Sequence, residues 1–186
     1  MRVNTIYPAI QGEGCLVGTP MILVRLQGCN LRCPFCDTRG TWSMEGGIEI
    51  SVPEIVAHVA QNATGHRWVL VTGGEPAMQD LGDLVDALHT KGYSVALETN
   101  GTLPITGDFD WVCVSPKGDV LQEALVLANE VKYIVKDRIP EPNFDGPTIC
   151  LQPESQDPAA TALCIEAVQE RGWRLSIQLH KYLHLP

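Results

Sequence analysis

The sequence predicts an α/β fold in which a mainly parallel sheet of about six strands, with few helices, forms an incomplete (β/α) barrel. Apolar strand-like runs alternate with helical patterns or long crossovers, as a parallel sheet requires. Polar and glycine-bearing segments follow these runs, and ligands bind at the carboxyl ends of parallel strands. A length of 186 residues suits one domain, residues 1–186, with a single hydrophobic core. A doubly wound open sheet is the alternative architecture.

Short apolar runs bounded by polar or turn-forming residues mark the strands. In chain order they are residues 3–7, 21–26, 68–71, 94–97, 111–114, 131–135, 148–151 and 174–178. Glycines within residues 11–14 predict a turn after the first strand, and the polar residues 39–50 predict an irregular segment. The motifs that follow the strands are therefore expected to meet at one edge of the sheet.

Helical patterns are clearest in three segments. Ser51 can cap a helix in which Glu54 completes a capping box. A second helix is expected over residues 79–90, with its leucines on one face. The last helix is capped by Asp157 and ends at Gly172. Residues 121–128 show a weak helical pattern, and residues 179–186 have no regular period.

The composition excludes several classes of protein. A formal net charge of −9 and a pI of about 4.9 disfavour attraction to nucleic acid or to an anionic membrane, so small molecules are the expected partners. No apolar run is long enough to span a bilayer, and a cytoplasmic protein is expected. Seven cysteines, of which four stand apart, do not resemble a secreted disulfide framework. These four, residues 15, 113, 150 and 164, are expected to be small buried thiols.

Three cysteines form the pattern C-x3-C-x2-C at Cys29, Cys33 and Cys36, directly after an apolar run. Three thiolates leave one coordination position open, which suits an iron–sulfur cluster with one iron free to bind another molecule. The alternative is a zinc site completed by a distant histidine, Cys113 or Cys150. Zinc sites more often use paired C-x2-C units, and the second pair is missing here.

The cysteine spacing, with Phe35 before the third cysteine, resembles the signature of the radical S-adenosylmethionine superfamily, and Thr72–Pro76 resembles its GGE motif. This resemblance implies a 4Fe–4S cluster whose open iron is chelated by S-adenosylmethionine. An electron then cleaves the sulfonium to give methionine and a 5′-deoxyadenosyl radical.

A closer resemblance, to the 7-carboxy-7-deazaguanine synthases, covers nearly the whole chain. It rests on Ile10–Gly14, Arg25, Gly28–Leu31, Cys36–Thr38, Glu98–Gly101, Ser115–Lys117, Leu151–Pro153 and His180–Pro186. The family belongs to the queuosine and 7-deazapurine pathway and consists of small homodimeric lyases. It implies conversion of 6-carboxy-5,6,7,8-tetrahydropterin to 7-carboxy-7-deazaguanine and ammonia, with Mg²⁺ and an electron donor such as a flavodoxin or ferredoxin.

The same resemblance implies the residues of the site and no catalytic residue beyond the cofactor ligands. Cys29, Cys33 and Cys36 would bind the cluster and Thr38 the Mg²⁺ ion. S-adenosylmethionine would be bound by Phe35, Asp37, Gly74, Glu75, Glu98, Ser115, Lys117, Gln152, Pro153, Glu154 and Ser155. Substrate would be bound by Ile10, Gln11, Gly12, Arg25, Thr72 and the terminal Pro186, through its carboxylate.

Some alternatives stay open. Arg25 lies on an otherwise apolar strand, where its guanidinium needs an anionic partner, either the substrate carboxylate or an internal carboxylate. His184 stands near a position where the family often has glycine, which could narrow the mouth of the pocket. At the level of function, the rivals are a small glycyl-radical-enzyme activase and a non-catalytic zinc or iron–sulfur module.

Overall fold

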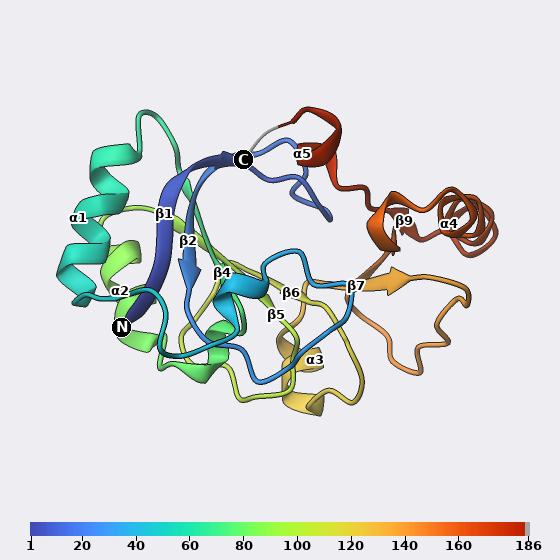
Figure 1. The fold of residues 1–186 in the computed structure, drawn as a ribbon, viewed down its shortest axis with the longest axis horizontal. Coiled ribbons are helices and arrows are strands. Elements are labelled where there is room, and N and C mark those ends of the chain that lie inside the picture. Colours follow the sequence, from blue (N-terminus) through green and yellow to red (C-terminus); the bar gives the residue numbers. More distant parts are fainter. Residues whose placement is uncertain (185–186) are drawn as a thin grey trace.

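The computed structural model describes residues 1–184, which fold into one curved sheet with helices along its outer side (Figure 1). The strands are β1 (Arg2–Ile10), β2 (Pro20–Leu26), β3 (Ile48–Glu49), β4 (Trp68–Gly73), β5 (Ser94–Thr99), β6 (Trp111–Val114), β7 (Glu130–Val135), β8 (Thr148–Pro153) and β9 (Arg174–Leu175). The α-helices are α1 (Val52–Asn62), α2 (Gly82–Thr90), α3 (Gln122–Leu127), α4 (Pro158–Arg171) and α5 (Leu179–Tyr182). Short 3₁₀ turns cover Arg39–Thr41, Pro76–Met78 and Glu154–Gln156.

The sheet has the order β3-β1-β2-β4-β5-β6-β7-β8-β9. β1 runs antiparallel to β2 and β3, and every later neighbouring pair is parallel. β3 and β9 lie at opposite edges, so the sheet curves without closing. The predicted incomplete barrel with a mainly parallel sheet is confirmed. The sheet has nine strands where about six were expected. Each of the eight apolar runs corresponds to one strand, and only β3, two residues long and too short to produce an apolar period, was not predicted.

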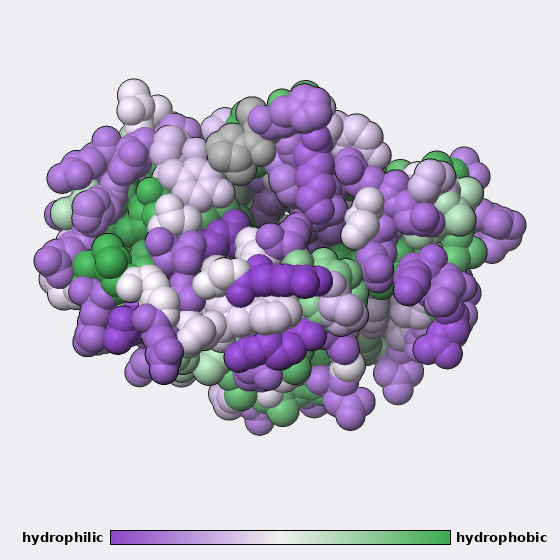
Figure 2. All heavy atoms as spheres, in the orientation of Figure 1, coloured by the Kyte–Doolittle hydropathy of each residue, from purple (hydrophilic) through white to green (hydrophobic). Residues whose placement is uncertain are grey.

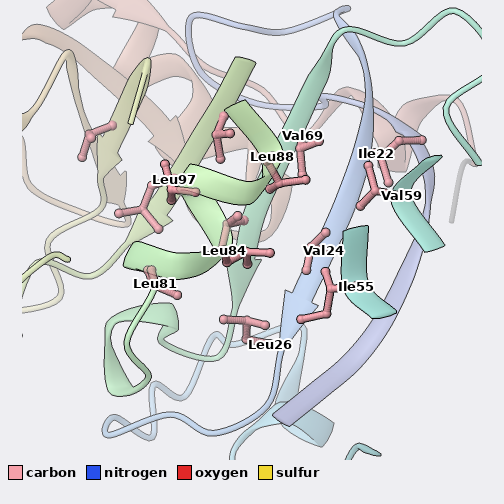
Figure 3. Packing of buried hydrophobic residues seen from close by; sticks show 14 of the residues in the cluster. Ile22, Val24, Leu26, Ile55, Val59, Val69, Leu81, Leu84, Leu88 and Leu97 are labelled. Atoms are coloured by element: carbon pink, nitrogen blue, oxygen red, sulfur yellow. The ribbon is translucent and has the colours of Figure 1, made fainter. Parts of the chain in front are cut away.

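The main core lies between the sheet and helices α1 and α2 (Figure 3). Ile55 and Val59 of α1 are fully buried, as are Leu84 and Leu88 of α2. Their i, i+4 spacing places the side chains of each helix on one face, which packs on the apolar residues of β2, β4 and β5 (Figure 3). This layer holds the strands at fixed positions. The opposite face of the sheet carries a smaller apolar cluster of Met21, Leu23, Leu70 and Ala96, together with the polar groups of the site. In residues 1–184 no helix combines the length and apolar character needed to cross a bilayer.

The predicted helix ends are mostly correct. The amide of Ser51 donates to Glu54 at 2.7 Å, which completes the predicted capping box of α1. Asp157 accepts a hydrogen bond from the amide of Ala160 at 2.8 Å, and Gly172 ends α4 in the left-handed conformation. α2 begins at Gly82, later than predicted, because the preceding segment forms a separate 3₁₀ turn.

Two predictions near the C-terminus are wrong. The last strand ends at Leu175, although residues 174–178 were expected to be extended. The chain leaves the sheet there because Ser176 and Gln178 direct their side chains to the N-terminal loop, where they bond to Gly14 and Glu13. Residues Leu179–Tyr182, expected to be irregular, form the single turn α5.

Candidate active site

The site is a cavity of about 490 Å³ at the carboxyl ends of the parallel strands. Hydrophilic side chains gather across the middle of the face shown in Figure 2. The cavity is lined by almost all of the residues named from the sequence: Ile10, Gln11, Gly12, Arg25, Cys29, Cys33, Phe35, Cys36, Asp37, Thr38, Thr72, Gly74, Glu98, Ser115, Lys117, Gln152, Pro153, Glu154 and Ser155. Their convergence follows from the parallel topology, since each segment stands at or beyond a strand end or on an inward-facing strand position. Pro186 lies outside the described residues.

The cysteine loop leaves β2 through Gly28, whose φ of +100° lies in the region that favours glycine. The segment Thr72–Pro76, which follows β4, holds this loop in place, since the amide of Glu75 donates to the carbonyl of Gly28 at 2.8 Å. A Cβ placed on Gly74 would lie 2.2 Å from that carbonyl oxygen and 2.7 Å from Cys29 Cβ. The second glycine of the GGE motif is thus required for the close packing of the two segments.

The possible metal ligands of the cysteine loop are three free, partly buried thiols on one wall of the cavity. The amide of Leu31 points to Cys29 Sγ at 3.4 Å, a contact that stabilises a thiolate. Within the described chain, the only triplet of possible metal ligands lying within 4.8 Å of one another is Cys15, Glu130 and Cys150. The sulfurs of the loop are therefore too widely spread to share one zinc ion, a spacing that suits a cluster in which each thiolate binds a different iron.

Glu75 is the one described member of the predicted set that does not line the cavity. Its side chain is 1% exposed and accepts hydrogen bonds from Thr99 Oγ1 and the amide of Asn100, both at 2.6 Å, and from the amide of Ala77 at 3.0 Å. Burial raises the pKa of the Glu75 carboxyl group. These hydrogen-bond donors lower the pKa, but they do not cancel the effect of burial. In this structure Glu75 joins the ends of β4 and β5.

A buried network of charges forms the floor of the cavity. Lys132 Nζ, on β7, lies 2.5 Å from Glu13 and 3.5 Å from Glu98. Burial by itself would lower the pKa of this ammonium, but the two carboxylates outweigh it and raise the pKa well above the usual value. Burial would raise the pKa of Glu13, whereas Lys132 and the amide donor of Gln178 lower it to about 2. The Lys132 ammonium and the Glu13 carboxylate therefore both stay charged at neutral pH.

Glu98 projects from β5 into the middle of this network. It accepts hydrogen bonds from Gln11 Nε2 at 3.1 Å and from Thr72 Oγ1 at 3.2 Å, in addition to its contact with Lys132. The sequence resemblance grouped Glu98 with S-adenosylmethionine, but its neighbours here are two residues of the predicted substrate set. Gln11, Thr72 and Glu98 thus form one hydrogen-bonded wall of the cavity.

Arg25 lines the cavity from β2. The sequence left open whether its anionic partner is a protein carboxylate or a ligand. Among residues 1–184, no carboxylate lies within 4.0 Å of the Arg25 guanidinium. An arginine on a mostly apolar strand, facing a cavity without such a partner, is suited to bind an anionic ligand.

Lys117 and Ser115 follow β6 on the far wall. Lys117 Nζ donates to Ser115 Oγ at 2.6 Å and lies 5.9 Å from the ring centroid of Phe35. Burial lowers the pKa of Lys117. Ser155 has a φ of +52°, rarely adopted by a residue with a side chain, at the rim after β8. Strain of this kind gathers at ligand-binding sites.

The C-terminal segment covers one side of the cavity. The amide of Leu179 donates to the carbonyl of Gly12 at 2.8 Å, and Lys181 Nζ lies 3.2 Å from the carboxylate of Asp37. Gln178 donates to both Glu13 and Asp37, at 2.9 and 3.3 Å. These contacts join the loop after β1, the cysteine loop and the segment around α5.

The sequence assigned no role to several polar residues that line this cavity, although three of them fall within the segments that resemble the family: Glu13, Lys132, Gln178, His180 and Lys181. Lys132 carried a usable signal, because a lysine inside the apolar run of residues 131–135 needs a charged partner for the same reason as Arg25. The others depend on contacts between residues far apart in the sequence. Glu13 and Gln178, for example, are separated by 165 positions.

Comparison with known proteins identifies the family of the chain. A model of the radical SAM superfamily matches residues 23–111. The 7-carboxy-7-deazaguanine synthase of Escherichia coli K12 is 36% identical over 98% of both chains, and that of Burkholderia multivorans is 38% identical over 99% of this chain and 98% of its own. The chain belongs to the 7-carboxy-7-deazaguanine synthase family. A crystal structure of QueE from Escherichia coli superposes with a TM-score of 0.86 at 34% identity, covering 96% of this chain and 94% of that one.

Membership of the radical SAM superfamily brings a 4Fe–4S cluster and S-adenosylmethionine, and the residues present fit both. Three free thiols on one wall, with an amide directed at one sulfur, match the ligand set of a cluster with an open iron. The cavity lies beside them, and its volume falls within the range of small-molecule sites.

Replacing Gly74 by alanine tests the contact between the cysteine loop and the strand-end motif. The added Cβ would meet Gly28 O and Cys29 Cβ, so the loop must shift, and turnover should fall about 100-fold. The measurement is steady-state turnover together with iron content after reconstitution. Gly40→Ala is the matched control, because a Cβ there meets nothing within 4 Å and turnover should be unchanged. Equal activity of the two variants would contradict the proposed packing role.

Replacing Glu13 by glutamine tests the buried pair. The pKa of Glu13 is about 2 in the folded protein against an ordinary 4.5, so its contribution to stability is present above pH 4.5 and lost as pH falls through 2. The variant should lose about 3 kcal/mol of unfolding free energy at pH 7 and about half of that at pH 3. Urea titrations at both pH values measure this difference.

The control for that titration is Glu49→Gln. Glu49 lies 4.0 Å from Arg2 with 78% of its side chain exposed, so its loss should change the unfolding free energy by less than about 0.5 kcal/mol. A Glu13→Gln effect that does not vary with pH would show that the carboxylate is not held charged by Lys132.

Proposed function

We propose that this protein is a radical S-adenosylmethionine lyase that converts 6-carboxy-5,6,7,8-tetrahydropterin to 7-carboxy-7-deazaguanine and ammonia. The observation that carries the proposal is the position of Arg25, which faces the same cavity as the three cluster thiols and has no carboxylate partner in residues 1–184. A carboxylated substrate supplies that anion. The full-length similarity to named 7-carboxy-7-deazaguanine synthases supports the same reaction.

The cofactor half of the cavity is assigned to the cysteine loop and the walls formed after β4, β6 and β8. When bound, the cluster and S-adenosylmethionine supply a 5′-deoxyadenosyl radical that abstracts hydrogen from the substrate. Gly74 lets backbone approach the cofactor, and Ser115, Lys117 and the segment from Gln152 to Ser155 would bind it through polar groups. These residues position the cofactor, and the reactive chemistry belongs to the cofactor itself.

The substrate half is assigned to the wall formed by β1, β2, β4 and β5. Arg25 would bind the substrate carboxylate, while Gln11, Thr72 and Glu98 would bind the polar edge of the pterin. We place Glu98 in this set, because its partners in the structure are Gln11 and Thr72. Its carboxylate can accept hydrogen bonds from ring N–H and amino groups of the pterin.

Thr38 is the proposed protein ligand of a Mg²⁺ ion shared with the substrate. Its hydroxyl lies 3.8 Å from Cys36 Sγ, so an ion bound there would sit next to the cluster. A neutral hydroxyl with several waters suits Mg²⁺, which loses its hydration shell reluctantly. The neighbouring Asp37 is directed to Lys181.

The wider assignments follow from family membership. We propose a cytoplasmic homodimer that is reduced by a flavodoxin or ferredoxin and has no nucleic-acid or membrane partner. The net charge of −9 supports the last part. Pro186, outside the described residues, is proposed to bind the substrate through its terminal carboxylate, and the contacts of α5 with Gly12 and Asp37 support this by carrying the chain to the cavity.

Two rival functions are less well supported. A glycyl-radical-enzyme activase must admit a protein segment, whereas here the C-terminal segment contacts both the N-terminal loop and the cysteine loop. A zinc module needs its thiols near one ion, and the loop thiols are spread more widely than that.

The deciding experiment is an anaerobic assay of the reconstituted enzyme with S-adenosylmethionine, reductant and the carboxylated tetrahydropterin. We expect 7-carboxy-7-deazaguanine and ammonia in equal amounts, detected by mass spectrometry. Cys33→Ala should lose the cluster and all cleavage of S-adenosylmethionine. Efficient cofactor cleavage by the wild type without any deazaguanine would refute the proposed substrate.

Replacing Arg25 by alanine separates substrate binding from cofactor chemistry. We expect kcat/KM for the pterin to fall about 100-fold, since a buried anion loses its charged partner. Uncoupled cleavage of S-adenosylmethionine without substrate should persist. Arg2→Ala, on the exposed end of β1, is the matched control and should keep full turnover. Parallel loss of both activities in Arg25→Ala would instead assign Arg25 a structural role.

A further inference from the structure

A second cluster of sulfur and carboxylate groups lies beneath the floor of the cavity, outside the residues assigned above. It combines Cys15, from the loop between β1 and β2, with Glu130 of β7 and Cys150 of β8. Glu130 precedes Lys132 by two positions, so both side chains point to the same face of β7, with Glu130 nearer the amino end of the strand. Cys113 of β6 borders the same group, with its sulfur 3.5 Å from Glu130.

The distances in this cluster match those of a metal site. The ligand atoms of Cys15, Glu130 and Cys150 all lie within 4.8 Å of one another, and the two sulfurs are 3.7 Å apart. Zinc–sulfur bonds of about 2.3 Å at tetrahedral angles place two sulfurs about 3.8 Å apart. A tetrahedral ion therefore fits between these two sulfurs with almost no change in their separation.

The burial of Glu130 is a second, independent observation. Glu130 is only 2% exposed, and its carboxylate accepts a hydrogen bond from the amide of Cys15 at 2.8 Å. Within the described chain no lysine, arginine or histidine lies within 4.0 Å of that carboxylate. A buried carboxylate without a counter-charge is costly, and a bound cation would remove this cost.

The backbone is shaped to bring the loop onto this carboxylate. Gly14 has a φ of +65°, and a Cβ placed on it would lie 2.1 Å from Glu130 Oε1. The amide of Gly14 donates to Ser176 Oγ at 2.8 Å, which fixes the loop from the other side. Glycine at this position thus permits the approach that puts Cys15 beside Cys150.

We infer that Cys15, Glu130 and Cys150 form a structural site for a divalent cation of the zinc type, separate from the iron–sulfur cluster. Two thiols lose their protons to solvent when the ion binds, and the carboxylate completes a three-residue set. Cys113 or a water molecule supplies the fourth ligand. The ion would fix the loop that carries Gln11, Gly12 and Glu13, and so set the floor of the active site.

The test uses full-length protein in which Cys29, Cys33 and Cys36 are replaced by alanine, so that the cluster thiols cannot bind zinc. After loading with Zn²⁺ and desalting, we expect about one zinc ion per chain by plasma mass spectrometry, as for a closed structural site. Adding Cys150→Ser should reduce this to less than about a tenth, because a key ligand is lost. Adding Cys164→Ser, a buried cysteine of α4 outside the cluster, is the matched control and should retain zinc.

Further measurements guard against misfolding of the variants. Circular dichroism should be the same for the two serine variants, and Cys15→Ser, which changes the partly exposed loop, should lose zinc as Cys150→Ser does. Replacing Zn²⁺ with Co²⁺ should give thiolate-to-cobalt charge-transfer absorption that vanishes in both. Absence of zinc from the folded triple variant, equal retention in Cys150→Ser, or a Cys15–Cys150 disulfide in place of the metal would overturn the inference.

Discussion

The buried ammonium of Lys132 is the interaction on which the rest of the site depends. The inner face of this open barrel carries only a small apolar cluster, so polar contacts also connect the strands on that face. Lys132 joins Glu13 of the N-terminal loop to Glu98 of β5, and Glu98 in turn holds Gln11 and Thr72. Because Lys132 is only 4% exposed, its ammonium depends on these two carboxylates for charge neutralisation in a low-dielectric interior.

The proposed function divides one cavity between two ligands. The carboxyl ends of β4, β6 and β8 present small or polar groups beside the cysteine loop, whereas the side toward β1 and β2 presents Arg25 and the Gln11–Glu98 wall. The chain connects these halves twice, through the cysteine loop after β2 and through the C-terminal segment between Gly12 and Asp37. A shift of either segment would therefore move the proposed substrate side relative to the cysteine loop.

Much of this could be predicted from the sequence, because parallel strands bring their ends together whatever the intervening chain does. The cysteine spacing, the glycines after β4 and the arginine on an apolar strand each carried a local signal with a physical cause. The contact between Glu13 and Gln178 could not be predicted, since it joins residues 165 positions apart. The edge strand β3 was missed for a related reason, because a pair of residues has no period.

Glu75 shows why a motif alone does not assign a role to each of its residues. Its carboxylate takes donors from Thr99 and Asn100 and lies away from the cavity, while its amide supports Gly28. The glutamate therefore fixes the ends of β4 and β5, and through Gly28 it fixes the first cysteine. The same argument applies to Glu130, buried beneath the floor with thiols and an amide as its neighbours. A buried carboxylate is tolerated where hydrogen-bond donors or a cation stabilise it. The protein chain supplies enough donors for Glu75, whereas Glu130 is the carboxylate for which we infer a bound cation.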